Sequence, residues 1–321
     1  MRMEKAYTIV FSLCLLAFTA YALLDTFVIT RVYETVDQSV QIQQASPTAE
    51  TEGRALAALQ TCGGGTEGRG KAQEEQSGAA DAENAAAADD EQAQIEISEY
   101  RVNDTSVYVA DIQLSSANQL KTAFSQNSYG RNVTADTSDT AASLGATLAI
   151  NGDNYGSREK GYVIRNGVLY RDTAAKDQED LVIYADGSFE IINESEITAQ
   201  ELLTNGAVQV FSFGPGLLEN GALTVDSSDE VDRAKASNPR TAIGILGENH
   251  YVFVVADGRT EESEGLSLYE LAVFMQGLGV ETAYNLDGGG SSTMVYQGTL
   301  VNNPTSGHGI DERAVTDILY I

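Results

Sequence analysis

The sequence predicts an α+β domain with a mixed, largely antiparallel β-sheet and a few flanking helices, preceded by an N-terminal transmembrane helix and a disordered stalk. Three observations predict this organisation. Short runs rich in β-branched and aromatic residues recur from Ile95 onward, and glycine-containing turn signals separate several of them. In one segment, residues 267–279, apolar residues recur at the spacing of a helix. The N-terminal region instead shows an uncharged apolar run followed by a polar, low-complexity tract.

Residues 1–37 are expected to form a cytoplasmic tail and a membrane anchor. Residues 6–24 carry no charge. As a helix, this segment is long enough to cross a hydrocarbon core of about 30 Å. Arg2 and Lys5 precede this run, so we expect a single-pass protein of the cell membrane with its C-terminal domain outside the cytoplasm. Ala20-Tyr21-Ala22 fits a signal-peptide cleavage site, which is the alternative. We favour the anchor, because the apolar run outlasts a typical signal-peptide core.

Residues 38–94 are expected to be a disordered, low-complexity linker. This segment contains mainly Ala, Gln, Glu, Gly, Ser and Thr and almost no large apolar residues. Such a composition cannot bury enough apolar surface to offset the entropy lost on ordering. The tract 78–90, rich in alanine and acidic residues, could become transiently helical. Residues 95–321 then form one folded domain.

The elements of that domain follow from local patterns. Strands are expected from Ile95 and at residues 106–110, 147–150, 162–164, 181–184, 207–210, 251–255, 282–286 and 293–296. The pairs Asn166-Gly167, Asp186-Gly187 and Asn220-Gly221 predict hairpin turns. A helix should begin after Ser267, whose capping box is completed by Glu270, and end at Gly279. Two further helices are expected at residues 115–124 and after Thr198.

Composition excludes several classes of protein. The formal net charge is −28, so the surface repels nucleic acid and anionic membranes, and neither is an expected partner of the folded domain. The two cysteines, Cys14 and Cys62, both precede Ile95, which excludes a disulfide framework in the domain. His250 and His308 are the only histidines and cannot by themselves form a zinc cluster.

The motif from Asn285 to Ser292, NLDGGGSS, is the strongest candidate for a functional site. It places the Asp287 carboxylate directly before three glycines and two serines, between two predicted strands. Glycine adopts positive φ easily, so consecutive backbone N–H groups of such a loop can converge on one anion. The alternative is a glycine hairpin with an ordinary turn aspartate.

Five ordered segments resemble the phosphodiester glycosidase family, and the resemblance extends over residues 95–321. They are Ala149-Ile150-Asn151-Gly152-Asp153-Asn154-Tyr155, Asn238-Pro239-Arg240-Thr241-Ala242-Ile243-Gly244, Asp257-Gly258-Arg259, the Asn285–Ser292 motif and Glu312-Arg313-Ala314-Val315. The chain has Asn238 where the family often has His. The resemblance implies a glycosidase that hydrolyses sugar-1-phosphodiester linkages, with a sugar-phosphate or glycan substrate in a cell-wall polymer, an exopolysaccharide or a related glycoconjugate.

Asp287 is the first candidate for the catalytic carboxylate, and Asp257 and Asp153 are the next. Each ends a predicted strand and lies beside or close to glycine, where a loop side chain can enter a cleft. Arginine suits a phosphate, because its planar fork holds two oxygens at once. The candidate binding residues are Asn151, Gly152, Tyr155, Arg240, Thr241, Arg259, Asn285, Gly288, Gly289, Gly290, Ser291, Ser292 and Arg313.

Several alternatives stay open at this point. No cofactor is expected, but the same aspartates could bind Ca²⁺ or Mg²⁺, since hard cations take carboxylate oxygens. A metal-dependent phosphodiesterase or a non-catalytic glycan-binding module could use the same residues. A serine hydrolase fits poorly, because Gly290-Ser291-Ser292-Thr293 lacks the glycine that follows the nucleophile two residues later.

Overall fold

The computed structural model describes residues 2–36, 93–226, 237–307 and 309–321. The predicted linker, with Cys62 and the tract 78–90, lies almost entirely outside the described residues, and so does His308. The described strand β2 begins at Gln94, next to the predicted start of the domain.

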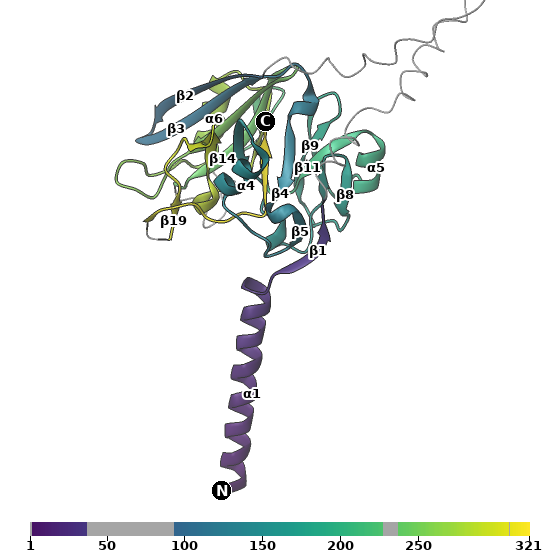
Figure 1. Ribbon diagram of the computed structural model, residues 1–321, viewed down its shortest axis with the longest axis vertical. Helices are drawn as coiled ribbons and strands as arrows, with labels where there is room; N and C mark the ends of the chain where they lie inside the picture. Colours follow the sequence, from purple (N-terminus) through teal and green to yellow (C-terminus); the bar gives the residue numbers. More distant parts are fainter. Residues whose placement is uncertain (1, 37–92, 227–236, 308) are drawn as a thin grey trace, which may run out of the picture.

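Helix α1 (Arg2–Phe27) occupies the predicted anchor region and projects from the body of the protein (Figure 1). Among the helices of the described chain, none combines the length and the apolar character that a membrane span requires. The predicted transmembrane helix is therefore not supported by the structure.

Three antiparallel sheets form the domain. The seven-stranded sheet has the order β13-β12-β16-β14-β15-β3-β2. Its strands are β2 (Gln94–Val102), β3 (Thr105–Gln113), β12 (Gly216–Glu219), β13 (Ala222–Leu223), β14 (Arg240–Gly247), β15 (His250–Ala256) and β16 (Thr282–Asn285).

The other two large sheets have five strands each. One has the order β10-β9-β11-β7-β8, built from β7 (Val163–Arg165), β8 (Val168–Arg171), β9 (Glu179–Tyr184), β10 (Phe189–Asn193) and β11 (Ala207–Phe211). The other has the order β18-β17-β6-β21-β4, built from β4 (Lys121–Phe124), β6 (Leu148–Asn151), β17 (Met294–Tyr296), β18 (Thr299–Leu300) and β21 (Asp317–Tyr320).

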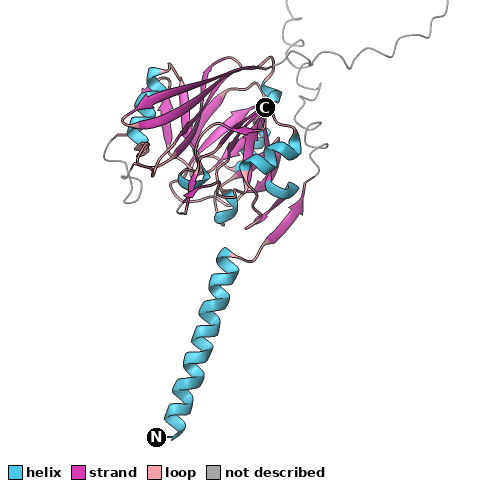
Figure 2. Cartoon of the chain, turned by 60° about the vertical axis from the view of Figure 1, so that its left-hand side comes forward, coloured by secondary structure: helices cyan, strands magenta, loops and turns pink. Residues whose placement is uncertain are grey.

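Two small pairs and the helices complete the described elements. The strand pairs are β1 (Arg31–Thr35) with β5 (Ser128–Arg131) and β19 (Thr305–Ser306) with β20 (Gly309–Ile310). The remaining helices are α4 (Thr137–Leu144), α5 (Ala199–Thr204) and α6 (Leu268–Gly277), with 3-10 turns η1 (Ala117–Gln119), η2 (Ser125–Asn127), η3 (Tyr155–Ser157) and η4 (Gly289–Ser291). Figure 2 shows that strands dominate the body of the domain.

The three large sheets meet at one central core. Phe253 of the seven-stranded sheet, Ile183 of the sheet containing β9 and Ile150 of the sheet containing β6 all belong to the same buried cluster. Each sheet packs its other face against a helix: α6 covers the seven-stranded sheet, α5 the sheet with β9, and α4 the sheet with β6. The α+β, sheet-dominated prediction is confirmed.

The local signals predicted most elements correctly. The capping box of Ser267 and Glu270 begins α6, and Thr198 with Glu201 caps α5 in the same way. Each of the three predicted Asn-Gly or Asp-Gly turns joins a pair of antiparallel strands: β7 to β8, β9 to β10 and β12 to β13.

The predicted helix at residues 115–124 is wrong. Ser116 and Gln119 form a capping box, but the helix they begin ends after the three residues of η1. Leu120 is extended, and Lys121–Phe124 pairs with β21 as strand β4. The pairing with β21 therefore overrides a local start signal. Helix α4 was not predicted. Its eight residues, TSDTAASL, contain too few apolar residues to show a helical spacing.

Strand β14 offers a matched test of this packing. A Cβ on Gly244 would lie 2.5 Å from Val280 Cγ1 and 3.1 Å from the Met275 methyl group, whereas a Cβ on Gly247 meets nothing within 4 Å. We expect Gly244→Ala to lower the free energy of unfolding by about 1–3 kcal/mol through overpacking. Gly247→Ala should change it by less than about 0.5 kcal/mol. Urea denaturation of both variants measures the difference, and equal effects would contradict the packing between β14 and α6.

Candidate functional site

The glycine motif joins two different sheets. Strand β16 leads into it from the seven-stranded sheet, and β17 leaves it in the five-stranded sheet that contains β6. The hairpin alternative is therefore wrong, since β16 and β17 do not pair with each other. Such a crossover between sheets brings elements from both into contact with one loop. We call residues 286–293 the glycine corner.

Close contacts explain the glycines of this corner. A Cβ on Gly288 would lie 2.8 Å from the Pro239 carbonyl oxygen. Gly289 has a φ of +64°, and a Cβ there would lie 2.9 Å from Nη2 of Arg259. The backbone contact at Gly288 and the positive φ at Gly289 therefore both favour glycine. The Arg259 guanidinium thus lies directly against the corner.

Three backbone N–H groups of the corner bond to carbonyl groups of the protein and not to an anion. Gly289 N donates to the Pro239 carbonyl at 2.8 Å, and Ser292 N donates to the Gly289 carbonyl at 3.1 Å. Ser291 N donates to the Gly288 carbonyl at 3.3 Å. These three donors therefore stabilise the fold of the corner.

Asp287, Ser291 and Arg313 form the polar centre of the corner. Oδ2 of Asp287 accepts hydrogen bonds from Ser291 Oγ at 2.6 Å and from Arg313 Nη2 at 2.8 Å. Arg313 also donates from Nε to Ser291 Oγ at 2.9 Å. Its side chain is 45% exposed, whereas that of Asp287 is 10% exposed. The second oxygen of Asp287, Oδ1, takes no part in these contacts.

Burial and charge act in opposite directions on Asp287. Burial raises the pKa of its carboxyl group, while Arg313 and the Ser291 hydroxyl lower it, and the net direction is upward. Desolvation favours the neutral form, and a paired cation favours the ionised form. A carboxyl group poised in this way can take part in proton transfer or stabilise a positive charge.

Asn151 and Thr241 hold the corner in place. Nδ2 of Asn151 donates to the Asp287 carbonyl at 2.6 Å, and its Oδ1 accepts from Thr241 Oγ1 at 2.9 Å. The same Oδ1 accepts from Thr293 N at 3.2 Å. Asn151 and Thr241 are fully buried, so the structure gives them a positioning role and no direct access to a sugar.

Two further candidate binding residues, Asn285 and Ser292, are also buried near the corner. Nδ2 of Asn285 donates to the Gly214 carbonyl at 2.8 Å. The Ser292 backbone carbonyl accepts from Asn302 Nδ2 at 2.9 Å. Within the described chain, neither Asn285 Oδ1 nor Ser292 Oγ has a hydrogen-bond partner.

Asp257 secures a neighbouring loop. Its Oδ1 accepts from Asn302 Nδ2 at 3.1 Å and from Asn303 N at 3.0 Å, and its Oδ2 accepts from Asn303 Nδ2 at 3.2 Å. Burial raises its pKa, and these hydrogen bonds oppose that shift. Both oxygens are therefore engaged within the protein.

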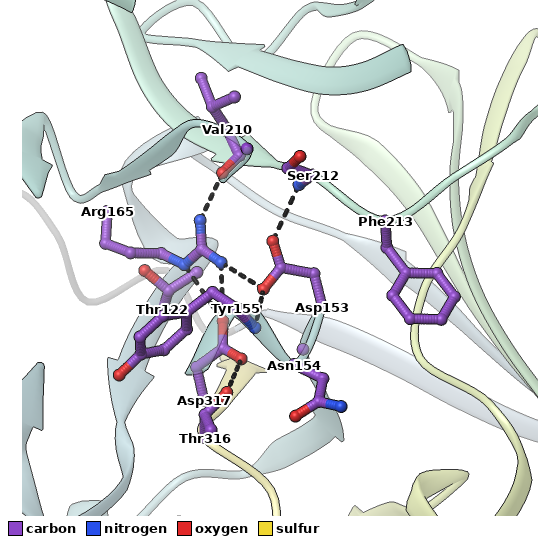
Figure 3. Close-up of polar contacts among 12 residues, drawn as sticks. Thr122, Asp153, Asn154, Tyr155, Arg165, Val210, Ser212, Phe213, Thr316 and Asp317 are labelled. Atoms are coloured by element: carbon purple, nitrogen blue, oxygen red, sulfur yellow. Dashed lines mark hydrogen bonds and ion pairs between the residues drawn. The ribbon is translucent and has the colours of Figure 1, made fainter. Parts of the chain in front are cut away.

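Asp153 lies in a closed ion network with Arg165 and Asp317 (Figure 3). Nη2 of Arg165 donates to Asp153 Oδ1 and to Asp317 Oδ2, both at 2.8 Å. Ser212 N donates to Asp153 Oδ2 at 2.8 Å. All three charged side chains are at most 1% exposed. The predicted accessibility of Asp153 is thus wrong, because the fold closes over it.

This network supports the corner through Gly152. A Cβ on Gly152 would lie 2.4 Å from the Asp317 carboxylate, so the packing requires glycine here. The Gly152 carbonyl accepts from Asp287 N at 3.3 Å. Burial and the nearby Asp153 charge raise the pKa of Asp317 to about 7, and Arg165 opposes them. One glycine therefore separates the buried ions from the candidate catalytic carboxylate.

Tyr155 and Arg240 do not face the corner. Tyr155 is 1% exposed and stacks on Tyr129 with ring centroids 5.2 Å apart. The prediction that it binds the substrate is therefore wrong, because its ring packs inside the protein. Arg240 is buried, and its Nε donates to the Leu266 carbonyl at 2.8 Å. It alternates along β14 with Thr241, so the two side chains lie on opposite faces of the sheet.

Arg259 lies on the solvent-accessible side of the corner. Its Nη2 donates to Asn238 Oδ1 at 3.2 Å, and the residue is exposed. Arg259 also lines a cavity of about 360 Å³ with Thr260, Thr305 and Ile310. Ser306 in β19 packs against Gly290, which places this cavity beside the corner. Its volume falls in the range of small-molecule sites, about 300–1,000 Å³.

Sequence reasoning missed several residues around the site. Arg158 lies 4.8 Å from the ring centroid of Phe213, and its Nη1 donates to the Ser212 carbonyl at 3.0 Å. Its charge lowers the pKa of Asp287. Arg158 lies three residues beyond the recognised motif that ends at Tyr155, and Phe213, Arg165 and Asp317 carried no local signal.

No three His, Cys, Asp or Glu side chains within the described chain converge as a metal site would require. The alternative of a bound divalent cation stays a prediction. Arg313 and Arg259 already bring two positive charges to the corner.

Comparison with known proteins identifies the family. Residues 144–321 match the family model described as phosphodiester glycosidase. The chain belongs to the phosphodiester glycosidase family. The match includes the glycine corner, Arg259, Arg313 and the buried ion network.

Individual relatives agree with this assignment. The chain is 32% identical over 181 residues to the SPbeta prophage-derived uncharacterized protein YomE of Bacillus subtilis, covering 55% of this chain and 28% of that protein. It is 32% identical over 184 residues to the N-acetylglucosamine-1-phosphodiester alpha-N-acetylglucosaminidase of Mus musculus, covering 52% of this chain and 35% of that enzyme. The chain thus spans about one third of the length of these relatives.

Solved structures also share the fold. The zebrafish N-acetylglucosamine-1-phosphodiester alpha-N-acetylglucosaminidase catalytic domain, described as auto-inhibited by its pro-peptide, has a TM-score of 0.58 and 25% identity, over 72% of this chain and 82% of that one. A hypothetical protein from Synechocystis has a TM-score of 0.56 at 13% identity, over 71% of this chain and 61% of that one, and shows similarity of fold alone.

The buried ions give a first prediction for this region. Arg165→Met should lower the free energy of unfolding by about 3–5 kcal/mol, because it leaves Asp153 and Asp317 buried without their cation. Urea denaturation measures the loss. Lys160→Met, which removes an exposed positive charge, is the control and should have little effect. A loss below about 1 kcal/mol for Arg165→Met would contradict the structural importance of this network.

A second buried carboxyl pair lies close by. Asp180 in β9 is fully buried, and its carboxyl group lies beside Glu194 and Ser212. Burial, and then the Glu194 charge, raise the pKa of Asp180 well above its usual value. Asp153, Tyr162 and Tyr284 are the other titratable groups near it.

Asp180 should therefore make stability depend on pH. Because its pKa is raised in the folded state, its contribution is complete below the unfolded pKa of about 4 and is lost as the pH rises. Asp180→Asn removes this titration and should raise the free energy of unfolding relative to the parent by about 1–3 kcal/mol at pH 8. The gain should shrink towards pH 4.

Asp186→Asn is the matched control for the pH experiment. The Ser188 side chain and backbone lower the pKa of Asp186, so its contribution has the opposite sign and is complete above the unfolded pKa. Urea denaturation between pH 4 and pH 8 measures all three proteins. A constant difference between Asp180→Asn and the parent over this range would show that Asp180 does not titrate there.

Proposed function

We propose that this protein is an extracytoplasmic glycosidase that hydrolyses sugar-1-phosphodiester linkages in a cell-wall polymer, an exopolysaccharide or a related glycoconjugate. Membership of the phosphodiester glycosidase family supports the reaction class. The observation that carries the proposal is the glycine corner, where Asp287 is hydrogen-bonded to Arg313 and Arg259 packs against Gly289. A carboxylate and two accessible arginines meet the needs of a sugar and its phosphate.

The reaction breaks the bond between the anomeric carbon and the phosphate oxygen. Positive charge develops on the sugar ring as an oxocarbenium ion, and the phosphate leaves as a monoester. A water oxygen forms the new bond to the anomeric carbon and loses a proton. Phosphate is a good leaving group, so electrostatic support matters more than strong protonation. Arg259 and Arg313 are the residues that we assign to the phosphate, because a guanidinium can hold two of its oxygens.

We assign the carboxylate role at the anomeric carbon to Asp287. Its Oδ2 is fixed by Ser291 and Arg313, which orients Oδ1 for a substrate. Asp257 and Asp153 accept hydrogen bonds at both oxygens, so we assign them to positioning the surrounding loops. Asn151 then acts through the corner, because it binds the Asp287 carbonyl.

Three observations support the proposed substrate and location. The Mus musculus relative is named for a phosphodiester of N-acetylglucosamine, which makes that sugar the first to test here. The strongly acidic composition, with a net charge of −28, disfavours a nucleic-acid substrate. The sequence of the first 37 residues is the basis for placing the domain outside the cytoplasm.

Hydrolysis in ¹⁸O-labelled water tests the proposal. We expect the protein to release the sugar from UDP-N-acetylglucosamine with the label in the sugar and none in the phosphate, because the carbon–oxygen bond breaks. Asp287→Asn should lower the rate by about 10²–10⁴-fold. Asp111→Asn is an exposed change on β3, where the carboxylate pairs with His250, and it should leave the rate near that of the parent. Product analysis by mass spectrometry reads both results.

Other outcomes point to the alternatives. Label in the phosphate, with loss of activity on adding a chelator, would indicate a metal-dependent phosphodiesterase. Binding of sugar phosphodiesters without turnover by any of them would indicate a glycan-binding module. A near-normal rate for a folded Asp287→Asn variant would remove Asp287 from the reaction.

A further inference from the structure

A second cationic cavity lies away from the glycine corner. It has a volume of about 180 Å³ and is lined by Arg31 and Tyr33 of β1, Tyr129 and Arg131 of β5, and Arg171 of β8. In Figure 1 this region lies where α1 joins the domain, whereas β19, beside the corner, lies at the opposite side of the view. The function proposed above makes no use of these residues.

Strand pairing brings two of the arginines together. β1 and β5 are antiparallel, and Arg31 is paired directly with Arg131. Gly130 permits this approach, because a Cβ there would lie 2.2 Å from the Arg31 carbonyl oxygen. Like charges opposite each other on neighbouring strands are unfavourable unless a counter-charge is close. The pairing therefore places two guanidinium groups beside the cavity, each with one carboxylate partner, Asp25 or Glu159.

Arg171 adds a fixed cation with a spare donor. Its Nη1 donates to the carbonyls of Tyr155 at 3.0 Å and Arg158 at 2.7 Å, and its Nε donates to the Gly161 carbonyl at 2.5 Å. These three bonds hold the guanidinium rigidly. Its buried Nη2 has no acceptor among the described residues. Buried donors are nearly always satisfied, so this atom points to a ligand or water.

The walls of the cavity are rigid and aromatic. Tyr129 stacks on Tyr155 with ring centroids 5.2 Å apart, and Tyr33 lies 5.8 Å from Tyr129. The volume is below the range of about 300–1,000 Å³ that is usual for drug-sized ligands. The space therefore suits one compact oxyanion.

The local charge is positive in a strongly acidic chain. Arg31 pairs with Asp25, and Arg131 pairs with Glu159 at 3.2 Å. The Glu159 side chain is 82% exposed, so its charge is well screened by water. Arg158 also borders the cavity, but its guanidinium lies over Phe213. Arg31, Arg131 and Arg171 thus outnumber the two carboxylates, although the whole chain has a net charge of −28.

We propose that this cavity is a second, non-catalytic binding site for a phosphate group. Arginines on two paired strands and a rigid guanidinium with a free N–H match the charge and the several acceptor oxygens of phosphate. The group can belong to a soluble phosphate ester or to an anionic lipid headgroup, since both present the same chemistry. Binding here holds a phosphate-bearing molecule on the domain without requiring hydrolysis at the corner.

Isothermal titration calorimetry of the full-length protein with inorganic phosphate, at low ionic strength, tests the site. Arg31→Gln with Arg131→Gln should weaken binding at least about ten-fold, because each lost charged hydrogen bond is worth about 1.5–3 kcal/mol. Arg101→Gln removes an exposed charge from β2 and is the matched control, expected within about two-fold of the parent. Arg259→Gln with Arg313→Gln removes both arginines of the glycine corner, so phosphate binding that survives this second double variant belongs to the cavity.

The outcomes separate this proposal from the hydrolytic one. Phosphate binding that is unchanged in the double variant of Arg31 and Arg131, or no binding by the parent, would overturn the proposal whatever the hydrolase assay shows. The double variant should keep its thermal midpoint and its rate of hydrolysis, since neither arginine lies at the corner. Glycerol 1-phosphate and phosphatidylglycerol vesicles distinguish the two sources: tighter binding of the first identifies a soluble ester, and of the second a lipid headgroup.

Discussion

The ion network of Asp153, Arg165 and Asp317 is the constraint on which the rest of the site depends. It joins the loop after β6, the end of β7 and the start of β21, and Arg165 also donates to the Val210 carbonyl in β11. Burying three charges is expensive, and they stay buried only because each is paired. Gly152 packs directly on this network and bonds Asp287, so the position of the catalytic candidate follows from the buried ions.

Charge is distributed unevenly over the molecule, and this distribution gives the site its character. A chain with a net charge of −28 repels phosphate at long range, so phosphate recognition requires local positive charge. Arg259 and Arg313 supply it at the glycine corner, and Arg31, Arg131 and Arg171 supply it in the second cavity. Arg165 has no such role, because two carboxylates enclose it.

Local signals predicted elements wherever neighbours in the chain decide the structure. The capping boxes at Ser267 and Thr198 both begin helices, and the Asn166-Gly167 turn forms a hairpin. The same reasoning failed at residues 115–124, where a capping box starts only η1 and β4 follows. Pairing with β21, almost 200 residues later in the chain, decides that strand, and a local pattern carries no information about such a partner.

The sequence by itself determined the family motifs, the acidic composition and the chemistry of Asp287, Arg259 and Arg313, since these depend on residue type and order. Only the tertiary structure decided which motif residues face a ligand. It buries Asp153, Asn151 and Tyr155 and turns Arg240 towards Leu266. It also supplies Arg165 and Asp317 from strands that carry no motif signal. The physical reason is that burial and ion pairing arise where the three sheets pack together. Local sequence patterns do not specify how the sheets pack.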